Sequence, residues 1–225
     1  MWNMNATAAG TPRARPAHPK PRARRLASKD VIIDAATALF LRNGYLGTSM
    51  DEIAAGARVS KQTVYTHFAD KEQLFIELIQ GNFKLVDEFV RAVADLLQDT
   101  PDVQRDLRVL ARRYVRSVIQ PPVLQLRRLI IGEAGRFPEL ARRYYEQVPQ
   151  RVIVALASSL QHLAGRGLLQ VDDPLLAANH FAWLVLAVPL DQAMFCGSDG
   201  SLTPAALERL ADAGVDVFVA AYARP

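Results

Sequence analysis

The chain has 225 residues, and half of them are hydrophobic, which is enough for one large or two modest domains with a buried core. Its single cysteine, Cys196, excludes an intramolecular disulfide framework and is typical of a reducing compartment. The net charge of +4 is unevenly distributed, because residues 1–71 carry eleven Lys or Arg against five Asp or Glu, whereas residues 72–225 carry sixteen against eighteen.

Residues 1–27 are expected to form a basic, disordered arm. Prolines 12, 16, 19 and 21 disfavour a helix there, and apolar residues are few. Two interpretations stay open: a solvated tail, or an arm that also contacts DNA phosphates or a minor groove. No apolar run precedes the basic residues, so we expect no signal peptide.

The first helix is expected over residues 29–43, with Ser28 as its N-cap. Apolar residues at helical spacing, among them Ile32, Leu39 and Phe40, should pack on the segment that follows. Asn43 and Gly44 together predict the C-cap.

A short helix follows, and a capping pattern marks its start. Ser49 with Glu52 three residues later is a capping box, and Thr48 with Asp51 is a second register for the same cap. The apolar face of this helix ends near Gly56.

A second short helix begins at Ser60 and turns Val64 and Phe68 inward. Asp70 with Gln73 repeats the capping pattern and starts a third, longer helix. Two short helices joined by a tight turn are the helix-turn-helix pattern, and the basic excess of this region suits phosphate contact.

The segment from Leu39 to Phe75 resembles the DNA-binding domain of the TetR family of bacterial transcriptional regulators. The residues that carry the resemblance are Phe40, Gly44, Tyr45, Thr48, Ser49, Ile53, Ala54, Val59, Ser60, Val64, Tyr65, Phe68, Lys71 and Glu72. Arg58 departs from the pattern, because a glycine is common at that position, and this puts the geometry of the turn in question.

This resemblance implies a set of DNA-contacting residues in and around the second short helix. It places phosphate contacts at Thr48, Tyr65, His67 and Lys71, and base-reading positions at Lys61, Gln62 and Thr63, with Ser60 on the same polar face. A polar helical face in isolation is usually only solvated. A glutamine that bonds an adenine edge in two places would contribute roughly 1–3 kcal/mol of discrimination.

The rest of the chain is helical in pattern and predicts an all-α fold. We expect helices over residues 71–98, 103–119, 123–134, 138–164, 174–195 and 204–223. Gly81 lies inside the first of these, which indicates either close packing or a bend. The apolar stretch 174–190 contains Asn179 and His180, so we interpret it as a buried helix and not as a membrane span.

Part of this helical region is similar to the C-terminal domain of AefR-like members of the TetR family. The matching residues are Leu129 to Leu140, Tyr144, Tyr145, Gly167, Leu169 and Asp172 to Pro174. The similarity implies a ligand-sensing and dimerisation domain without identifying the ligand. We therefore expect a basic arm (1–27), a three-helix helix-turn-helix DNA-binding domain (28–75) and a larger helical ligand-binding and dimerisation domain (76–225).

Ligand-pocket candidates are large or polar residues spread over this last region, although each residue taken singly is more typical of plain core. They are Phe83, Phe89, Arg128, Glu133, Phe137, Tyr144, Phe181, Trp183, Gln192 and Met194. Pockets favour the space between bundle helices. Pro149 and Pro189 each free a backbone carbonyl inside a helix. The expected occupant is a mostly hydrophobic compound, aromatic ones included.

No motif indicates catalysis or a cofactor. The histidines and Cys196 lack metal-ligand spacing, and the sequence contains no nucleophile–base pattern and no glycine-rich phosphate loop. We therefore expect no enzyme, no metal and no cofactor.

The sequence as a whole predicts a cytoplasmic, homodimeric repressor that a small hydrophobic effector releases from a palindromic, double-stranded DNA operator. Two-fold dimers are expected because one short recognition helix reads only a few base pairs. The dimer contact is expected on residues 175–195 together with Leu207, Leu210, Val215, Phe218 and Val219. The alternatives are a ligand-independent DNA-binding protein and an activator of the same fold. The operator, the effector and the sign of regulation stay open.

Overall fold

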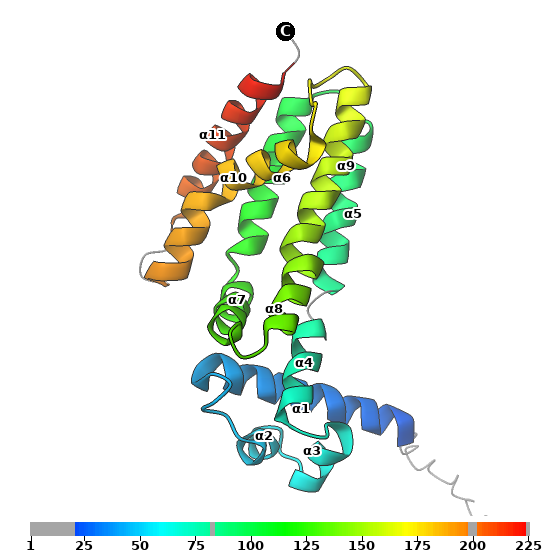
Figure 1. The fold of residues 1–225 in the computed structure, drawn as a ribbon, viewed down its shortest axis with the longest axis vertical. Helices are drawn as coiled ribbons and strands as arrows, with labels where there is room; N and C mark the ends of the chain where they lie inside the picture. Colours follow the sequence, from blue (N-terminus) through cyan, green and yellow to red (C-terminus); the bar gives the residue numbers. More distant parts are fainter. Residues whose placement is uncertain (1–20, 82–83, 198–201, 224–225) are drawn as a thin grey trace, which may run out of the picture.

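The computed structural model describes residues 21–81, 84–197 and 202–223, and these form helices joined by short turns (Figure 1). The N-terminal part comprises α1 (Pro21–Asn43), α2 (Met50–Gly56), α3 (Lys61–His67) and α4 (Lys71–Gly81). The larger part comprises α5 (Lys84–Gln98), α6 (Val103–Val118), α7 (Pro121–Glu133), α8 (Pro138–Tyr145), a π-helical turn η1 (Glu146–Gln150), α9 (Arg151–Gly165), α10 (Pro174–Cys196) and α11 (Pro204–Tyr222). The predicted all-α fold is confirmed.

Helix α1 begins earlier than the sequence suggested. It starts at Pro21, so the prediction of a disordered arm is wrong for residues 21–27, and Ser28 lies inside the helix instead of capping it. Proline is well tolerated in the first turn, where its missing N–H would have had no helical partner. Residues 1–20 of the expected arm lie outside the described residues.

The single helix expected over residues 71–98 is two helices, α4 and α5. Asn82 and Phe83 lie between them and outside the described residues, so the ligand prediction for Phe83 cannot be placed. Gly81 ends α4, and a Cβ built on it would meet no atom within 4 Å. Close packing therefore does not require a glycine there.

Prolines begin four of the remaining helices, namely α7, α8, α10 and α11. Asp173 caps α10, and Thr203 caps α11. The helix expected over residues 138–164 is divided by η1, which contains Pro149. Because proline lacks a backbone donor, a widened turn accommodates it without ending the helical path.

Two hydrophobic clusters organise the molecule. One lies in the bundle of α5, α6, α9, α10 and α11. The other lies in the N-terminal part formed by α1 to α4, which we call the head. The head cluster extends into α7 and α8 through five buried side chains, which are Leu126, Leu129, Ile130, Leu140 and Tyr144. Helices α7 and α8 lie next to α1 and α4 in Figure 1, so the head rests on these two helices.

Helix α10 is long and apolar enough to cross a membrane by length and composition alone. Here it packs between α9 and α11 and buries Ala177, Ala178, Phe181 and Val185. The core helix of a water-soluble protein has the same composition, so this feature is weak support for a membrane protein. In α11, Leu207, Val215 and Phe218 are buried within the chain, so the prediction that they form the dimer contact is wrong.

Candidate functional site

The head contains the helix-turn-helix that the capping pattern predicted. The Ser49 hydroxyl accepts a hydrogen bond from the Glu52 N–H (3.2 Å), and the Glu52 carboxylate accepts one from the Ser49 N–H (2.8 Å). The Ser49 hydroxyl also donates to the Glu52 carboxylate (2.8 Å), and the bonds that this hydroxyl and the Ser49 N–H donate hold the pKa of the Glu52 carboxyl below its ordinary value. Helix α2 buries Met50, Ile53 and Ala54 against the head, so its N-terminus is fixed by both the cap and the core.

The turn between α2 and α3 has a well-defined geometry in spite of Arg58. The Val59 N–H donates to the Ala54 carbonyl (3.0 Å), and the Arg58 N–H donates to the Ala55 carbonyl (3.1 Å). This pair of bonds is a Schellman motif, in which the residue after the C-cap is left-handed. Arg58 has φ = +54°, and it is the one residue other than glycine with a positive φ in the described part of the chain.

Helix α3 presents its polar side chains outward, as expected for a recognition helix. Its N-cap is Ser60, whose hydroxyl accepts from the Thr63 N–H (3.1 Å), and its inward side buries Val64. Lys61, Gln62 and Tyr65 are exposed, while Thr63 and His67 are half-buried. These side chains form a continuous set that can approach the edges of bases in a major groove.

Lys61 forms an ion pair with helix α2. Its ammonium lies 2.7 Å from the Asp51 carboxylate on α2. The hydrogen bond to Asp51 and the negative charge of the Asp51 carboxylate both raise the pKa of Lys61. Lys61 would therefore have to break its ion pair with Asp51 before its ammonium could contact a base.

Two of the expected phosphate contacts are engaged inside the head. Thr48 is 1% exposed, and its hydroxyl donates to the Gly44 carbonyl (2.9 Å). The Lys71 ammonium donates to the carbonyls of Tyr45 (2.9 Å) and Thr48 (2.8 Å) and lies over the Tyr45 ring. Thr48 closes the α1–α2 loop internally and Lys71 holds that loop against α4, structural roles that the sequence did not predict.

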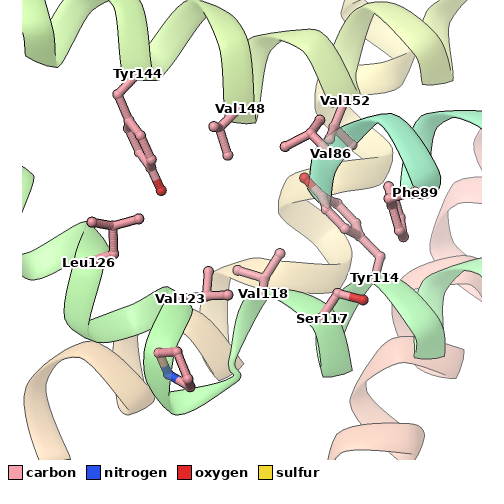
Figure 2. A pocket seen from close by; sticks show the side chains of 11 residues that line it. Val86, Phe89, Tyr114, Ser117, Val118, Val123, Leu126, Tyr144, Val148 and Val152 are labelled. Carbon is pink, nitrogen blue, oxygen red and sulfur yellow. The ribbon is translucent and has the colours of Figure 1, made fainter. Parts of the chain in front are cut away.

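A cavity of about 180 Å³ lies in the larger part, between α5, α6, α7, α8 and α9 (Figure 2). Two predicted ligand residues, Phe89 and Tyr144, line it. The other lining residues are Val86, Tyr114, Ser117, Val118, Pro122, Val123, Leu126, Val148 and Val152. Sequence reading missed most of them because valines at helical spacing look like ordinary core.

A second cavity of about 130 Å³ adjoins the first, and the two share Tyr114 and Tyr144 as walls. Trp183, another predicted ligand residue, lines this second space together with Arg127 and Asn179. Burial raises the pKa of Tyr114 to about 12 and also raises the pKa of Tyr144, and the positive charge of Arg127 acts against both increases.

The other residues predicted to bind the ligand do not line these two cavities. Phe181 is fully buried against Phe218 in the bundle core, with ring centroids 5.4 Å apart. Phe137 packs on Tyr45 in the head cluster. Arg128 donates to the Met194 carbonyl (3.1 Å) near the end of α10 and borders a separate cavity.

Glu133, Gln192 and Met194 do not line either of the two adjoining cavities. Within the described residues, no group of three or more His, Cys, Asp or Glu side chains is placed to hold a metal ion.

Comparison with known proteins agrees with both halves of this description. Residues 32–78 match the family described as bacterial regulatory proteins, tetR family. Residues 105–224, more than half of the chain, match the family described as AefR-like transcriptional repressor, C-terminal domain. These are families of transcriptional regulators and not of enzymes.

Solved structures extend the match to nearly the whole chain. A TetR-family transcriptional regulator from Mesorhizobium loti is 44% identical, with a TM-score of 0.82 over 89% of this chain and 99% of that one. The flavonoid-responsive regulator FrrA is 36% identical, with a TM-score of 0.66 over 88% of this chain and 97% of that one.

Curated relatives match over a smaller part of the chain. The transcriptional activator FasR of Mycolicibacterium smegmatis is 35% identical over 83 residues, which are 37% of this chain and 36% of FasR. The chain spans about a third or less of the length of the curated relatives it matches. The helix-turn-helix geometry, the two family matches and the near-complete structural alignment together show that this chain belongs to the TetR family of DNA-binding transcriptional regulators, with an AefR-like C-terminal domain.

Proposed function

We propose that this protein is a cytoplasmic, homodimeric repressor that leaves a palindromic operator when a small, largely hydrophobic effector enters the bundle. The observation that carries the proposal is the pairing of two features in one chain. An exposed polar recognition face lies on α3, and a mostly apolar cavity in the larger part is bordered by α7 and α8, the two helices that support the head. The proposed domains are a DNA-binding head, which takes in residues 21–27 because they belong to α1 and extends to residue 75, and a sensor (76–225).

DNA recognition would rest on the exposed face of α3. We propose base reading by Lys61, Gln62 and Thr63, and phosphate contact by Tyr65 and His67, with Ser60 beside them. Gln62 is the sharpest candidate, because its side chain is exposed and an amide can bond an adenine edge at two points. Thr48 and Lys71 would act indirectly, by holding the loop that leads into α2.

The dimer would form through α10 and α11. Helix α10 leaves Trp183 (54% exposed), Val188 (57%) and Phe195 (87%) uncovered, and α11 adds Val217 (55%). Large apolar side chains gathered on neighbouring helices are typical of an interface. We expect Val188→Asp to convert a dimer to a monomer in sedimentation, while Val154→Asp on α9, which is 54% exposed, should leave the dimer intact.

The effector would occupy the cavity of about 180 Å³ between α5, α6, α7, α8 and α9. Its lining is mostly valine and aromatic, which favours a hydrophobic body. FrrA, a relative with 36% identity, is described as flavonoid-responsive, and this supports an effector with aromatic character. An effector releases DNA only if it binds the two states of the protein with different affinity.

Selection of binding sites from random duplex DNA tests the repressor proposal. We expect an enriched palindrome whose affinity falls steeply with salt, because phosphate contacts release counterions. Gln62→Ala should relax the preference at one base pair in each half-site by roughly 1–3 kcal/mol. Gln161→Ala, an exposed change on α9, serves as the control. Failure to enrich any palindrome would contradict the proposal.

An activator of the same fold is the second candidate, since the relative FasR is described as a transcriptional activator. A reporter gene placed behind the selected operator separates the two. Expression that rises when the regulator is deleted supports a repressor, and expression that falls supports an activator.

A further inference from the structure

The second of the two adjoining cavities is lined by an arginine that has no partner among the described residues. Arg127 on α7 is half-buried and lines the second cavity. No other described residue pairs with its guanidinium through a hydrogen bond or an ion pair. Its neighbour Arg128 is different, because it donates to a backbone carbonyl near the end of α10. A guanidinium that lines a cavity and has no partner there is available to bind an anionic group of a ligand.

Two tyrosine hydroxyls join this charge. Figure 2 shows the hydroxyl of Tyr144 directed into the cavity from the α8 side and that of Tyr114 directed into it from the α6 side. Neither hydroxyl has a hydrogen-bond partner among the described residues. The Arg127 guanidinium is close enough for its charge to oppose the effect of burial on the pKa of both tyrosines. Arg127, Tyr114 and Tyr144 are thus three unsatisfied donors around one space.

The lining offers nothing to neutralise this charge from within. Neither cavity has an Asp or Glu side chain among its described lining residues. Arg127 is the one charged side chain among them. The remaining walls are apolar, with Phe89, Val118 and Val148 among them. A site of this composition complements a molecule with an apolar body and one anionic end.

We propose that the effector is an apolar carboxylic acid in its ionised form, whose carboxylate is held by Arg127 with the hydroxyls of Tyr114 and Tyr144. Its apolar body fills the cavity of about 180 Å³. A planar carboxylate matches the fork of a guanidinium and accepts from the hydroxyls as well. Cavities of roughly 150 Å³ hold a benzene ring, so the body is a single aromatic ring or a medium-length acyl chain. This inference rests on the proposed effector role of the cavity.

Paired probes test the inference on the full chain without DNA. The acids are trans-cinnamate and octanoate, and the neutral partners are cinnamamide and octanamide, which have nearly the same shape. Isothermal titration near neutral pH should show at least one acid binding roughly 10- to 100-fold more tightly than its amide. The fluorescence of Trp183, which lines the second cavity, gives an independent readout.

Substitutions assign the preference to one side chain. Arg127→Met should bring the affinity of the acid down to that of the amide and leave the amide unchanged. Arg127→Lys should keep part of the preference, because the charge stays while the two-pronged geometry is lost. Arg143→Met, an exposed change on α8, should leave both affinities unchanged.

The outcomes are distinct from those of the repressor proposal. Equal binding of acid and amide, tighter binding of the amide, or no binding of either acid at millimolar concentration would each overturn the carboxylate assignment. Persistence of the acid preference in Arg127→Met would do the same. None of these results affects site selection on DNA, so the DNA-binding proposal stands or falls separately.

Discussion

Phe137 packs edge-on against Tyr45, with ring centroids 4.9 Å apart and ring planes at 78°. Phe137 precedes α8 in the larger part of the chain, and Tyr45 follows α1 in the head. Phe75 of α4 completes the cluster, and the Arg136 guanidinium lies over the Tyr45 ring. Since Tyr144 of α8 lines the cavity and also belongs to the head cluster, one short helix borders both the cavity and the head.

Phe137→Ala should therefore weaken both stability and signalling. Loss of a partly buried aromatic side chain should lower the free energy of unfolding by about 2 kcal/mol, measured by urea denaturation. Effector-induced release from DNA should shrink, because α8 loses its contact with Tyr45. Ile131→Ala, an exposed change on α7, is the control. Unchanged stability together with unchanged release would contradict the proposed route.

Arg58→Gly should stabilise the head. The left-handed backbone conformation of Arg58 costs free energy for a residue with a Cβ, whereas glycine adopts it without that cost. We expect the free energy of unfolding to rise by about 1 kcal/mol. Arg58→Ala removes the charge but keeps the Cβ, so thermal unfolding of this variant should show no comparable gain. A gain of the same size in both variants would point to charge instead of backbone conformation.

Gly214→Ala should destabilise the bundle. A Cβ on Gly214 of α11 would lie 2.7 Å from the Leu184 carbonyl oxygen of α10, and backbone cannot move aside as a side chain can. The two helices would have to separate, at a cost of roughly 1–3 kcal/mol in urea denaturation. Gly132→Ala in α7 meets no atom within 4 Å and should instead stabilise the protein by up to about 1 kcal/mol.

Acid should destabilise the bundle partly through Asp106. This buried carboxylate accepts hydrogen bonds from Arg105 (2.9 Å) and from the Thr100 hydroxyl, which hold the pKa of Asp106 below its ordinary value of 3.8. A carboxyl with a lowered pKa in the folded state stabilises the fold above its ordinary pKa. That contribution is lost as pH falls through the lowered value.

The measurement is urea unfolding from about pH 6 to pH 3. Asp106→Asn should reduce the loss of stability across the acidic end of this range, whereas Asp95→Asn, an exposed change on α5, should leave the curve unaltered. An identical acid dependence in Asp106→Asn and the unmodified protein would show that Asp106 does not contribute.

Features made by neighbours in sequence were predicted well. The caps at Ser49, Ser60 and Asp70 all form as expected, because each joins atoms three or four residues apart. The departure noted at Arg58 also has a local cause, since a Schellman motif requires a left-handed residue at that point. Helical periodicity then determined the all-α fold.

Tertiary packing decided the roles of side chains whose partners are distant in sequence. Lys71 holds carbonyls 23 and 26 residues away, and Phe137 joins the head although it lies far from it along the chain. The sequence alone determined the all-helical fold and the starts of α2, α3 and α4, but it missed the start of α1 and the division of the segments 71–98 and 138–164. It left open which apolar residues surround a cavity and which form solid core, because both show the same helical spacing. Only the way α5 to α9 pack leaves a space beside Tyr114 and Tyr144 and closes the one around Phe181.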